Sequence, residues 1–409
     1  MDKKEVYLDY AATTPMDPRV REAMAPFLDE KYGNPSSIHR KGREAREALD
    51  HARETVAGIF HAQPDEIVFT GGGTEAINLA LFGAGRQHKP SGQHIVTTKI
   101  EHHAVLHACD ALEKEGCEAT YLRVDAEGRI SHDAIAAALR PDTVLVSVMY
   151  ANNEIGTVEP IAEIAKELRT YRQQRESQSG ASAPSPKRLW RVGDNPKPPF
   201  FFVDACQAAG ALTLNVAELG VDMMVINGSK IYGPKGVGCL YVRRGIKLQP
   251  LIYGGGQEKG LRSGTENVAG IVGFATALEI AERERVSEST RLTALRDGFI
   301  AVVLQRIPNA VLNGHATERL PNNINISIPG LEGEVAVLYL DARSVYCSTG
   351  SACSATSLEP SHVIAALGRP RQYADGSLRF TLGRGTTKDD LDYVLEALVD
   401  IVGKLRRSQ

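Results

Sequence analysis

The chain has 409 residues and a formal net charge of -3. This length exceeds the usual size of one compact core, so we expect one large and one smaller domain. The nearly neutral charge argues against a general nucleic-acid surface and leaves small molecules and proteins as partners. Six cysteines, with no CxxC pair and no metal-ligand spacing, are too few for a disulfide framework and fit a reducing cytoplasm.

The first residues carry no targeting pattern. Charged residues pass directly into Val6-Tyr7-Leu8, and no apolar run in the chain is long enough to cross a membrane. We therefore predict a cytoplasmic protein without a membrane segment. Helical patterns follow at Asp17 to Tyr32 and at Ser36 to Phe60, and an apolar stripe runs along one face of the second pattern.

A glycine-rich turn then joins a strand to a helix. The strand Ile67 to Thr70 runs through three glycines, ending at Gly73, into a helical pattern that begins near Thr74. Unpaired amides and the positive end of a helix form an anion site, with the Thr74 hydroxyl as an extra donor. No Gly-Lys-Ser/Thr follows, so the turn is not a Walker A loop. A tight connection without a ligand also explains this turn.

Two later apolar strands end in residues of opposite charge. Phe200 to Val203 is closed by Asp204, and Asp222 to Ile226 leads into a glycine-rich turn that holds Lys230. Ligands of open α/β sheets bind at such strand ends. A desolvated lysine amine attacks aldehydes, and a buried carboxylate keeps the pyridinium nitrogen of pyridoxal phosphate protonated. On these residues alone, a surface lysine and a helix N-cap at Asp204 remain open.

The order of elements predicts the architecture. Strands alternate with helical segments from about residue 66 to 245, which is the pattern of a mostly parallel sheet covered by helices. We predict a large domain over residues 18–260 and a smaller α+β domain formed by residues 1–17 and 261–409. The polar segment 172–199 is predicted to be an inserted exposed loop, with a partner-binding role as the alternative.

Five segments, in this order and spacing, resemble the cysteine desulfurase family of pyridoxal-phosphate enzymes. They are Tyr7-Leu8-Asp9-Tyr10-Ala11-Ala12-Thr13-Thr14, Gly33-Asn34-Pro35-Ser36-Ser37, Glu101-His102-His103, Arg262-Ser263-Gly264-Thr265 and Gly350-Ser351-Ala352-Cys353. The resemblance covers nearly the whole chain. It implies the α/β fold of fold type I enzymes, with a mostly parallel seven-stranded sheet, and bound pyridoxal 5'-phosphate.

The resemblance also implies roles around the cofactor. Lys230 would form the Schiff base, Asp204 would pair with the pyridinium nitrogen, and His102 would stack on the ring and handle protons. Thr265 would reach the phosphate of the neighbouring subunit, which implies a homodimer. Without the resemblance, His102 would be interpreted as a surface or core histidine. The remaining implied contacts to the ring or the phosphate are those of Gly73, Thr74, Asn153, Gln207 and Ser229.

The substrate residues are implied in the same way. Arg379 would bind the carboxylate of L-cysteine with its planar fork, and Asn34 would be a second contact. Cys353 lies in a run of small residues that predicts a mobile loop, and its thiolate would take the substrate sulfur. Cys347 is a second candidate thiol. No metal is expected.

The implied activity is the conversion of L-cysteine to L-alanine with a persulfide on Cys353. The persulfide would pass to an acceptor protein, either an iron-sulfur scaffold or a sulfur carrier. Selenocysteine lyase or another pyridoxal-phosphate-dependent transaminase is the nearer alternative, although a transaminase has no need of Cys353. A non-catalytic interaction protein of the same fold is the more distant alternative, and the joint presence of Lys230, Asp204, His102 and Arg379 argues against it.

Overall fold

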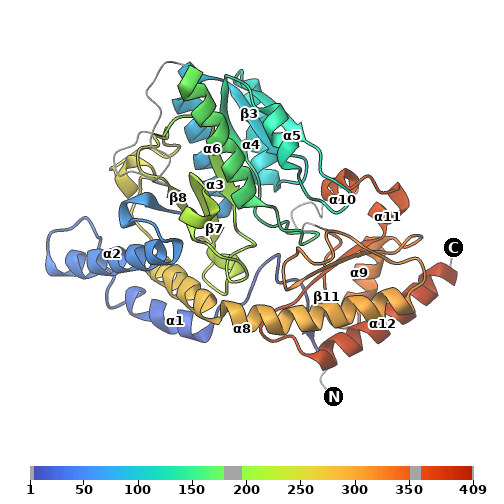
Figure 1. Cartoon of the computed structure of the whole chain (residues 1–409). Helices are drawn as coiled ribbons and strands as arrows, with labels where there is room; N and C mark the ends of the chain where they lie inside the picture. Colours follow the sequence, from blue (N-terminus) through green and yellow to red (C-terminus); the bar gives the residue numbers. More distant parts are fainter. Residues whose placement is uncertain (1–3, 179–195, 351–360, 408–409) are drawn as a thin grey trace.

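The computed structural model describes residues 4–178, 196–350 and 361–407. Its largest sheet has seven strands in the order β2-β8-β7-β6-β5-β3-β4 (Figure 1). Every neighbouring pair is parallel except the two pairs that β8 makes. The predicted, mostly parallel seven-stranded sheet is therefore confirmed. The strands are β2 Ile67–Thr70, β3 His94–Thr98, β4 Glu118–Leu122, β5 Thr143–Ser147, β6 Phe200–Asp204, β7 Met223–Asn227 and β8 Gly238–Val242.

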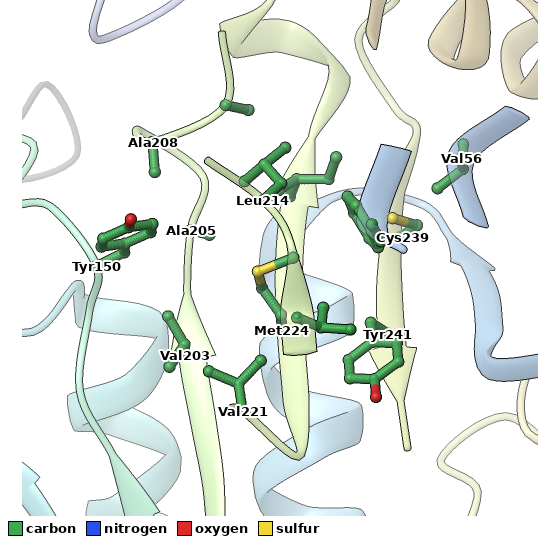
Figure 2. Close-up of a cluster of buried hydrophobic side chains, with 14 of the residues drawn as sticks. Val56, Tyr150, Val203, Ala205, Ala208, Leu214, Val221, Met224, Cys239 and Tyr241 are labelled. Atoms are coloured by element: carbon green, nitrogen blue, oxygen red, sulfur yellow. The ribbon is translucent and has the colours of Figure 1, made fainter. Parts of the chain in front are cut away.

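The central strands β5, β6 and β7 are rich in apolar residues and almost entirely buried, because helices cover both faces of the sheet. In β6, Phe200 and Phe202 pack with α3 and α4, whereas Phe201 and Val203 pack with α2, α6 and the first half of α8. Figure 2 shows part of the apolar cluster that contains Val203, whose side chain lies close to those of the neighbouring strands. These helices are α2 Arg40–Phe60, α3 Gly73–Gln87, α4 His103–Lys114, α6 Ile161–Gln178 and α8 Val268–Arg306.

A second core lies around two small sheets formed by the chain's two ends. The short β1 pairs in parallel with β11, and β12, β10 and β9 form an antiparallel sheet. The second half of α8 packs on this core, so α8 runs from the large sheet to the small ones (Figure 1). The domain boundaries at residues 17/18 and 260/261 stay a prediction. The elements here are β1 Val6–Tyr7, β9 Val311–Leu312, β10 Asn323–Ser327, α9 Gly333–Asp341, β11 Val345–Tyr346, β12 Ser377–Thr381 and α12 Lys388–Arg407.

The remaining elements are short. No helix in the described ranges is long and apolar enough to span a membrane. The short remaining elements are the α-helices α1 Pro18–Met24, α5 His132–Ala138, α7 Val216–Leu219, α10 His362–Ala366 and α11 Arg371–Asp375, and the 3-10 turns η1 Ala25–Phe27, η2 Pro64–Glu66, η3 Lys89–Ser91, η4 Gly228–Lys230 and η5 Glu258–Gly260.

The structure corrects three sequence expectations. The helical pattern predicted from Asp17 to Tyr32 is helical only over α1 and the 3-10 turn η1, and residues 28–32 are not helical. The helix predicted from Ser36 begins at Arg40, because the His39 ring accepts a hydrogen bond from the amide of Gly42 and caps the helix there. The loop predicted over 172–199 is wrong for residues 172–178, which are the last turns of α6. Arg172 fixes these turns to the sheet, because its guanidinium binds Asp222 at 2.5 Å. Residues 179–195 lie outside the described residues.

Glu159 gives the fold a predicted pH dependence. Its carboxyl group is buried, with one oxygen bound to the amide of Ile130 at 2.9 Å and the other without a partner among the described residues. Burial raises the pKa of this carboxyl to about 8. The folded state therefore binds the proton more tightly than the unfolded chain, and stability falls as the pH rises from the unfolded pKa through the folded one.

We predict that Glu159→Gln, which removes this charge, is more stable than the wild type at about pH 9 by roughly 2–4 kcal/mol. The difference should shrink toward about pH 5, where the wild-type carboxyl is protonated in the folded state. Urea unfolding at both pH values measures it. A stability difference that is independent of pH would contradict the prediction.

Candidate functional site

A cavity of about 240 Å³ lies where the carboxyl ends of β2, β3, β5, β6 and β7 meet. This is the edge of an open α/β sheet where ligands bind. The structure brings eight of the predicted site residues together here, while the roles assigned to them stay predictions. The eight are Gly73, Thr74, His102, Asn153, Asp204, Gln207, Lys230 and Arg379.

Lys230 enters the cavity from the turn that follows β7. Asn227 caps this turn, because its side chain accepts a hydrogen bond from the amide of Ser229. Glycine is needed at Gly228, where a Cβ atom would lie 2.8 Å from the carbonyl oxygen of Pro234. The Lys230 Nζ donates to the carbonyl oxygens of Ala11 at 2.9 Å and Ala12 at 2.6 Å. The amine is therefore held at the end of the sheet, between the two small-residue carbonyls.

Asp204 ends β6, and its side chain is 6% exposed. One carboxylate oxygen accepts the amide of Cys206 at 2.9 Å, which forms a turn, and no helix begins at Ala205. The helix N-cap considered for Asp204 is therefore wrong. Burial, followed by the charge of Asp204, raises the pKa of the Cys206 thiol, so this thiol stays protonated beside the carboxylate.

The start of α3 forms a cradle for an anion. The first hydrogen bond within the helix runs from Ala76 to Gly72, so the amides before Ala76 have no partner within the helix. A Cβ atom at Gly73 would lie 3.0 Å from the Cys206 Sγ, so the cradle fits only a glycine without displacement. The helix dipole and these amides favour an anion at Gly73 and Thr74.

His102 is held in place by the helix that it caps. Its Nδ1 accepts the amide of Ala104 at 3.0 Å, so a neutral ring carries its proton on Nε2. The preceding residue, Glu101, is buried and accepts hydrogen bonds from the Met149 amide at 2.8 Å and the Thr98 hydroxyl at 3.1 Å. Burial raises the pKa of the Glu101 carboxyl. These bonds join the ends of β3 and β5 and fix the orientation of His102.

Arg379 brings a cation into the cavity from β12. Its side chain is 1% exposed, and its two terminal nitrogens donate to the Asn153 carbonyl at 3.1 Å and to Asp9 at 2.7 Å. Its Nε is buried without a partner among the described residues. The guanidinium thus lines the cavity with one counterion and spare donor capacity, which suits a carboxylate ligand.

The cavity fits pyridoxal 5'-phosphate. This cofactor presents an aldehyde, a pyridine nitrogen and a phosphate, which call for an amine, a carboxylate and an anion cradle. Lys230 supplies the amine, Asp204 the carboxylate, and Gly73 with Thr74 the cradle, all in one cavity.

Comparisons with known proteins identify the family. The family model for class-V aminotransferases matches residues 6–174 and 178–394. A protein named cysteine desulfurase IscS from Dictyoglomus turgidum is 52% identical over 404 residues, which span 99% of this chain and 96% of that protein. The chain belongs to the cysteine desulfurase family. Another family member named cysteine desulfurase IscS, from Methanosarcina thermophila, is 45% identical over 99% of this chain and 94% of its own length.

Solved structures agree with this family. A NifS-like protein has a TM-score of 0.86 at 34% identity and is matched over 98% of this chain and 100% of its own chain. A structure of SspA in complex with cysteine has a TM-score of 0.75 at 32% identity, over 93% of this chain and 99% of that chain.

Three described residues that were predicted from the desulfurase resemblance do not line the cavity. The carbonyl of Ser229 accepts hydrogen bonds from Thr14. Asn34 is exposed, and its side chain accepts the amide of Ser36 at 2.9 Å. Thr265 is exposed. Cys353 lies outside the described residues. In the described ranges, no group of three or more His, Cys, Asp or Glu side chains could hold a metal ion.

Among the residues that the sequence interpretation left without a role are polar ones in or beside the desulfurase cavity. Asp9 binds Arg379, and both Cys206 and Asn227 line the cavity. Asp9 lies in the first family segment, and Cys206 lies between Asp204 and Gln207. The available signal was therefore position in a family segment for Asp9 and closeness in sequence to a predicted cofactor residue for Cys206.

Proposed function

We propose that this protein is a cysteine desulfurase that converts L-cysteine to L-alanine and leaves the sulfur as a persulfide on Cys353. An acceptor protein, either an iron-sulfur scaffold or a sulfur carrier, would then receive the sulfur. The observation that carries this proposal is the grouping of Lys230, Asp204, His102 and Arg379 in one cavity of a chain of this family. Relatives that match nearly the whole chain bear the name cysteine desulfurase.

Pyridoxal 5'-phosphate supplies, when bound, an aldehyde that condenses with amines and a ring that accepts the electron pair left by a removed proton. Gly73 and Thr74 would hold its phosphate, and Asp204 would pair with its ring nitrogen. His102 would lie against the ring, and Gln207 would bind the ring oxygen. Further ring and phosphate contacts are proposed for Asn153 and Ser229.

Each remaining residue has a defined task. Arg379 would bind the carboxylate of L-cysteine, with Asn34 as a further contact, and so orient the carbon that loses a proton. The Lys230 Nζ would take that proton as a general base. The Cys353 thiolate would then form a bond to the substrate sulfur as the carbon-sulfur bond breaks. The electron pair of the broken bond stays on the carbon fragment. This fragment takes up one proton at the carbon that held the sulfur and regains the proton removed from its α-carbon, and it then leaves as L-alanine.

The nucleophile is assigned to Cys353 rather than to Cys347. The Cys347 side chain is 8% exposed, and burial, followed by the charge of Asp9, raises the pKa of its thiol. A buried thiol of raised pKa is a poor nucleophile. Cys347 is therefore assigned to the core of the small sheets.

We also propose a cytoplasmic homodimer. Thr265 is exposed, as a residue that contacts a second subunit must be before assembly. Arg262, three residues earlier, binds Glu75 at 2.9 Å and so places this segment beside the start of α3. Across the dimer, Thr265 would complete the phosphate cradle of the partner subunit.

The test of the proposed function is product formation from L-cysteine by the purified, cofactor-loaded protein in the presence of a reductant. We expect equal amounts of alanine and sulfide from the wild type, and a loss of at least about 10³-fold for Cys353→Ala with the cofactor still bound. Cys117→Ala, which removes a half-buried thiol before β4, is the matched control and should retain activity.

The outcomes separate the alternatives. Unchanged activity of Cys353→Ala would remove the assigned nucleophile. A cofactor-loaded wild type that acts on selenocysteine or on an amino-group acceptor, and not on L-cysteine, would favour a lyase or a transaminase. A purified protein without any borohydride-reducible cofactor would favour the non-catalytic interaction protein.

A further inference from the structure

Glu154 lies between the two ends of the segment that carries Cys353. That segment, residues 351–360, leaves the described chain at Gly350 and rejoins it at Ser361. The Ser361 hydroxyl donates to the Glu154 Oε2 at 2.5 Å. A Cβ atom placed on Gly350 would lie 2.8 Å from the same oxygen and 3.4 Å from the Cβ of Ser361. One carboxylate oxygen thus binds one end of the segment and lies close to the other.

The Ser361 end has no spare bonding capacity for another arrangement. Its oxygen accepts the amides of Val363 at 3.1 Å and Ile364 at 3.3 Å and so caps α10. A hydroxyl has a single proton to donate, and this proton goes to Glu154. The position of the start of α10 therefore depends on the Glu154 carboxylate.

Glu154 is itself rigidly placed. Its side chain is 1% exposed, its amide donates to the Asn152 side chain at 2.8 Å, and its carbonyl accepts the Asn325 side chain at 3.1 Å. A buried carboxylate is retained only where partners compensate for its loss of water. The Ser361 hydroxyl is such a partner, so the compensation for this buried carboxylate comes from the residue at one end of the segment.

The same turn also contacts Arg379, the residue that would bind the substrate carboxylate. Asn153 precedes Glu154 and lines the cavity, and its carbonyl accepts Arg379 at 3.1 Å. Arg379 pairs with Ser348 through two backbone hydrogen bonds of 2.6 and 3.2 Å. Arg379 therefore binds both the backbone at Ser348, two residues before Gly350, and the turn that holds Glu154.

We propose that Glu154 is a positioning residue for sulfur transfer, whose carboxylate fixes both ends of the Cys353 segment relative to the bound substrate. The proposal rests on the proposed function, because it acts through the Cys353 thiol. Reacting atoms must be held within a narrow range, and a shift of about 1 Å can lower a rate about 10²-fold. Glu154 is not among the described residues that line the cavity, so its effect should fall mainly on the transfer step.

The experiment is a single turnover of the cofactor-loaded protein with L-cysteine, with the Cys353 persulfide measured by mass spectrometry. We expect Glu154→Ala to lower the rate of persulfide formation about 10- to 100-fold. Cofactor content and the absorbance change on adding L-cysteine should stay within about 2-fold of the wild type. Glu154→Gln keeps an oxygen for the Ser361 hydroxyl and should recover most of the rate.

Further variants keep the test decisive if Glu154→Ala does not fold. Ser361→Ala removes the donor and Gly350→Ala crowds the acceptor oxygen, so each should slow persulfide formation. The double variant Glu154→Gln/Ser361→Ala should be no slower than Ser361→Ala alone, because both changes act on one contact. Glu163→Ala, an exposed acid on α6, is the control and should react normally.

Two results would overturn the proposal. The first is a normal rate of persulfide formation in Glu154→Ala, or in both Ser361→Ala and Gly350→Ala. The second is a lost rate accompanied by lost cofactor or lost cysteine binding, which would assign Glu154 to the support of Asn153. Neither result resembles failure of the proposed function, in which the wild type forms no persulfide on Cys353.

Discussion

Lys230→Ala is expected to lower alanine formation from L-cysteine by at least about 10³-fold. Among the described residues that line the cavity, Lys230 is the only lysine. Its amine has two proposed tasks, covalent attachment of the cofactor and removal of a proton from the substrate, and alanine performs neither. The phosphate cradle and Asp204 remain in the variant, so the cofactor should still bind without the covalent bond.

Borohydride reduction followed by protein mass measurement checks this directly. The wild type should gain the mass of the reduced cofactor on the peptide that contains Lys230, and the variant should gain none. Lys235→Ala is the matched control, because Lys235 is an exposed lysine on the same glycine-rich turn. Cofactor mass fixed to another lysine in the Lys230→Ala protein, together with retained activity, would show that the anchor has been assigned wrongly.

The large sheet could be predicted because its strands carry a strong local signal. Runs such as Phe200 to Val203 are apolar at every position, and the structure shows alternate side chains packing against helices on opposite faces. Asp204 and Lys230 each follow such a run, and parallel strands bring their carboxyl ends to one edge. Local pattern and topology together therefore placed these two residues in one cavity.

The contacts of Arg379 could not be predicted in this way. Asp9 and Arg379 are 370 residues apart, and their pairing depends on the N-terminal segment lying against β12. No periodicity in either segment reports such a contact. The hydrogen bond between Ser361 and Glu154 also could not be predicted, because the two residues are 207 positions apart in the chain. The first contact joins the N-terminal segment to β12, and the second joins the loop after β5 to the start of α10, so only the folded chain determines which side chains meet.

The C-terminal end of α6 also could not be predicted from the sequence pattern. Residues 172–178 have the polar composition of a loop, and they are helical because Arg172 binds Asp222 and the carbonyl of Pro199. Intrinsic propensity is a weak signal, and a tertiary contact of this kind overrides it.

The second large effect is expected at Arg379. Arg379→Ala should lower kcat/KM for L-cysteine by about 10²- to 10³-fold, mainly through KM, because a buried charge-assisted pair with a carboxylate is lost. The variant also leaves Asp9 facing the cavity without its cation, so the substrate carboxylate would be repelled. Steady-state kinetics of alanine formation measure this loss. Arg371→Ala, an arginine with 78% side-chain exposure, is the control.

Removal of the Asp9 charge should partly offset the loss of Arg379. Asp9→Asn in the Arg379→Ala background should recover about 10-fold of the lost affinity, because it removes the repelling charge without restoring the cation. Cysteamine, which is cysteine without its carboxylate, should bind the wild type and Arg379→Ala alike, as measured by the absorbance change of the bound cofactor. An equal loss of cysteamine and L-cysteine binding in Arg379→Ala would mean that Arg379 supports the cavity through Asn153. Arg379 would then not bind the substrate carboxylate. Substrate recognition would then have to be assigned to another cation.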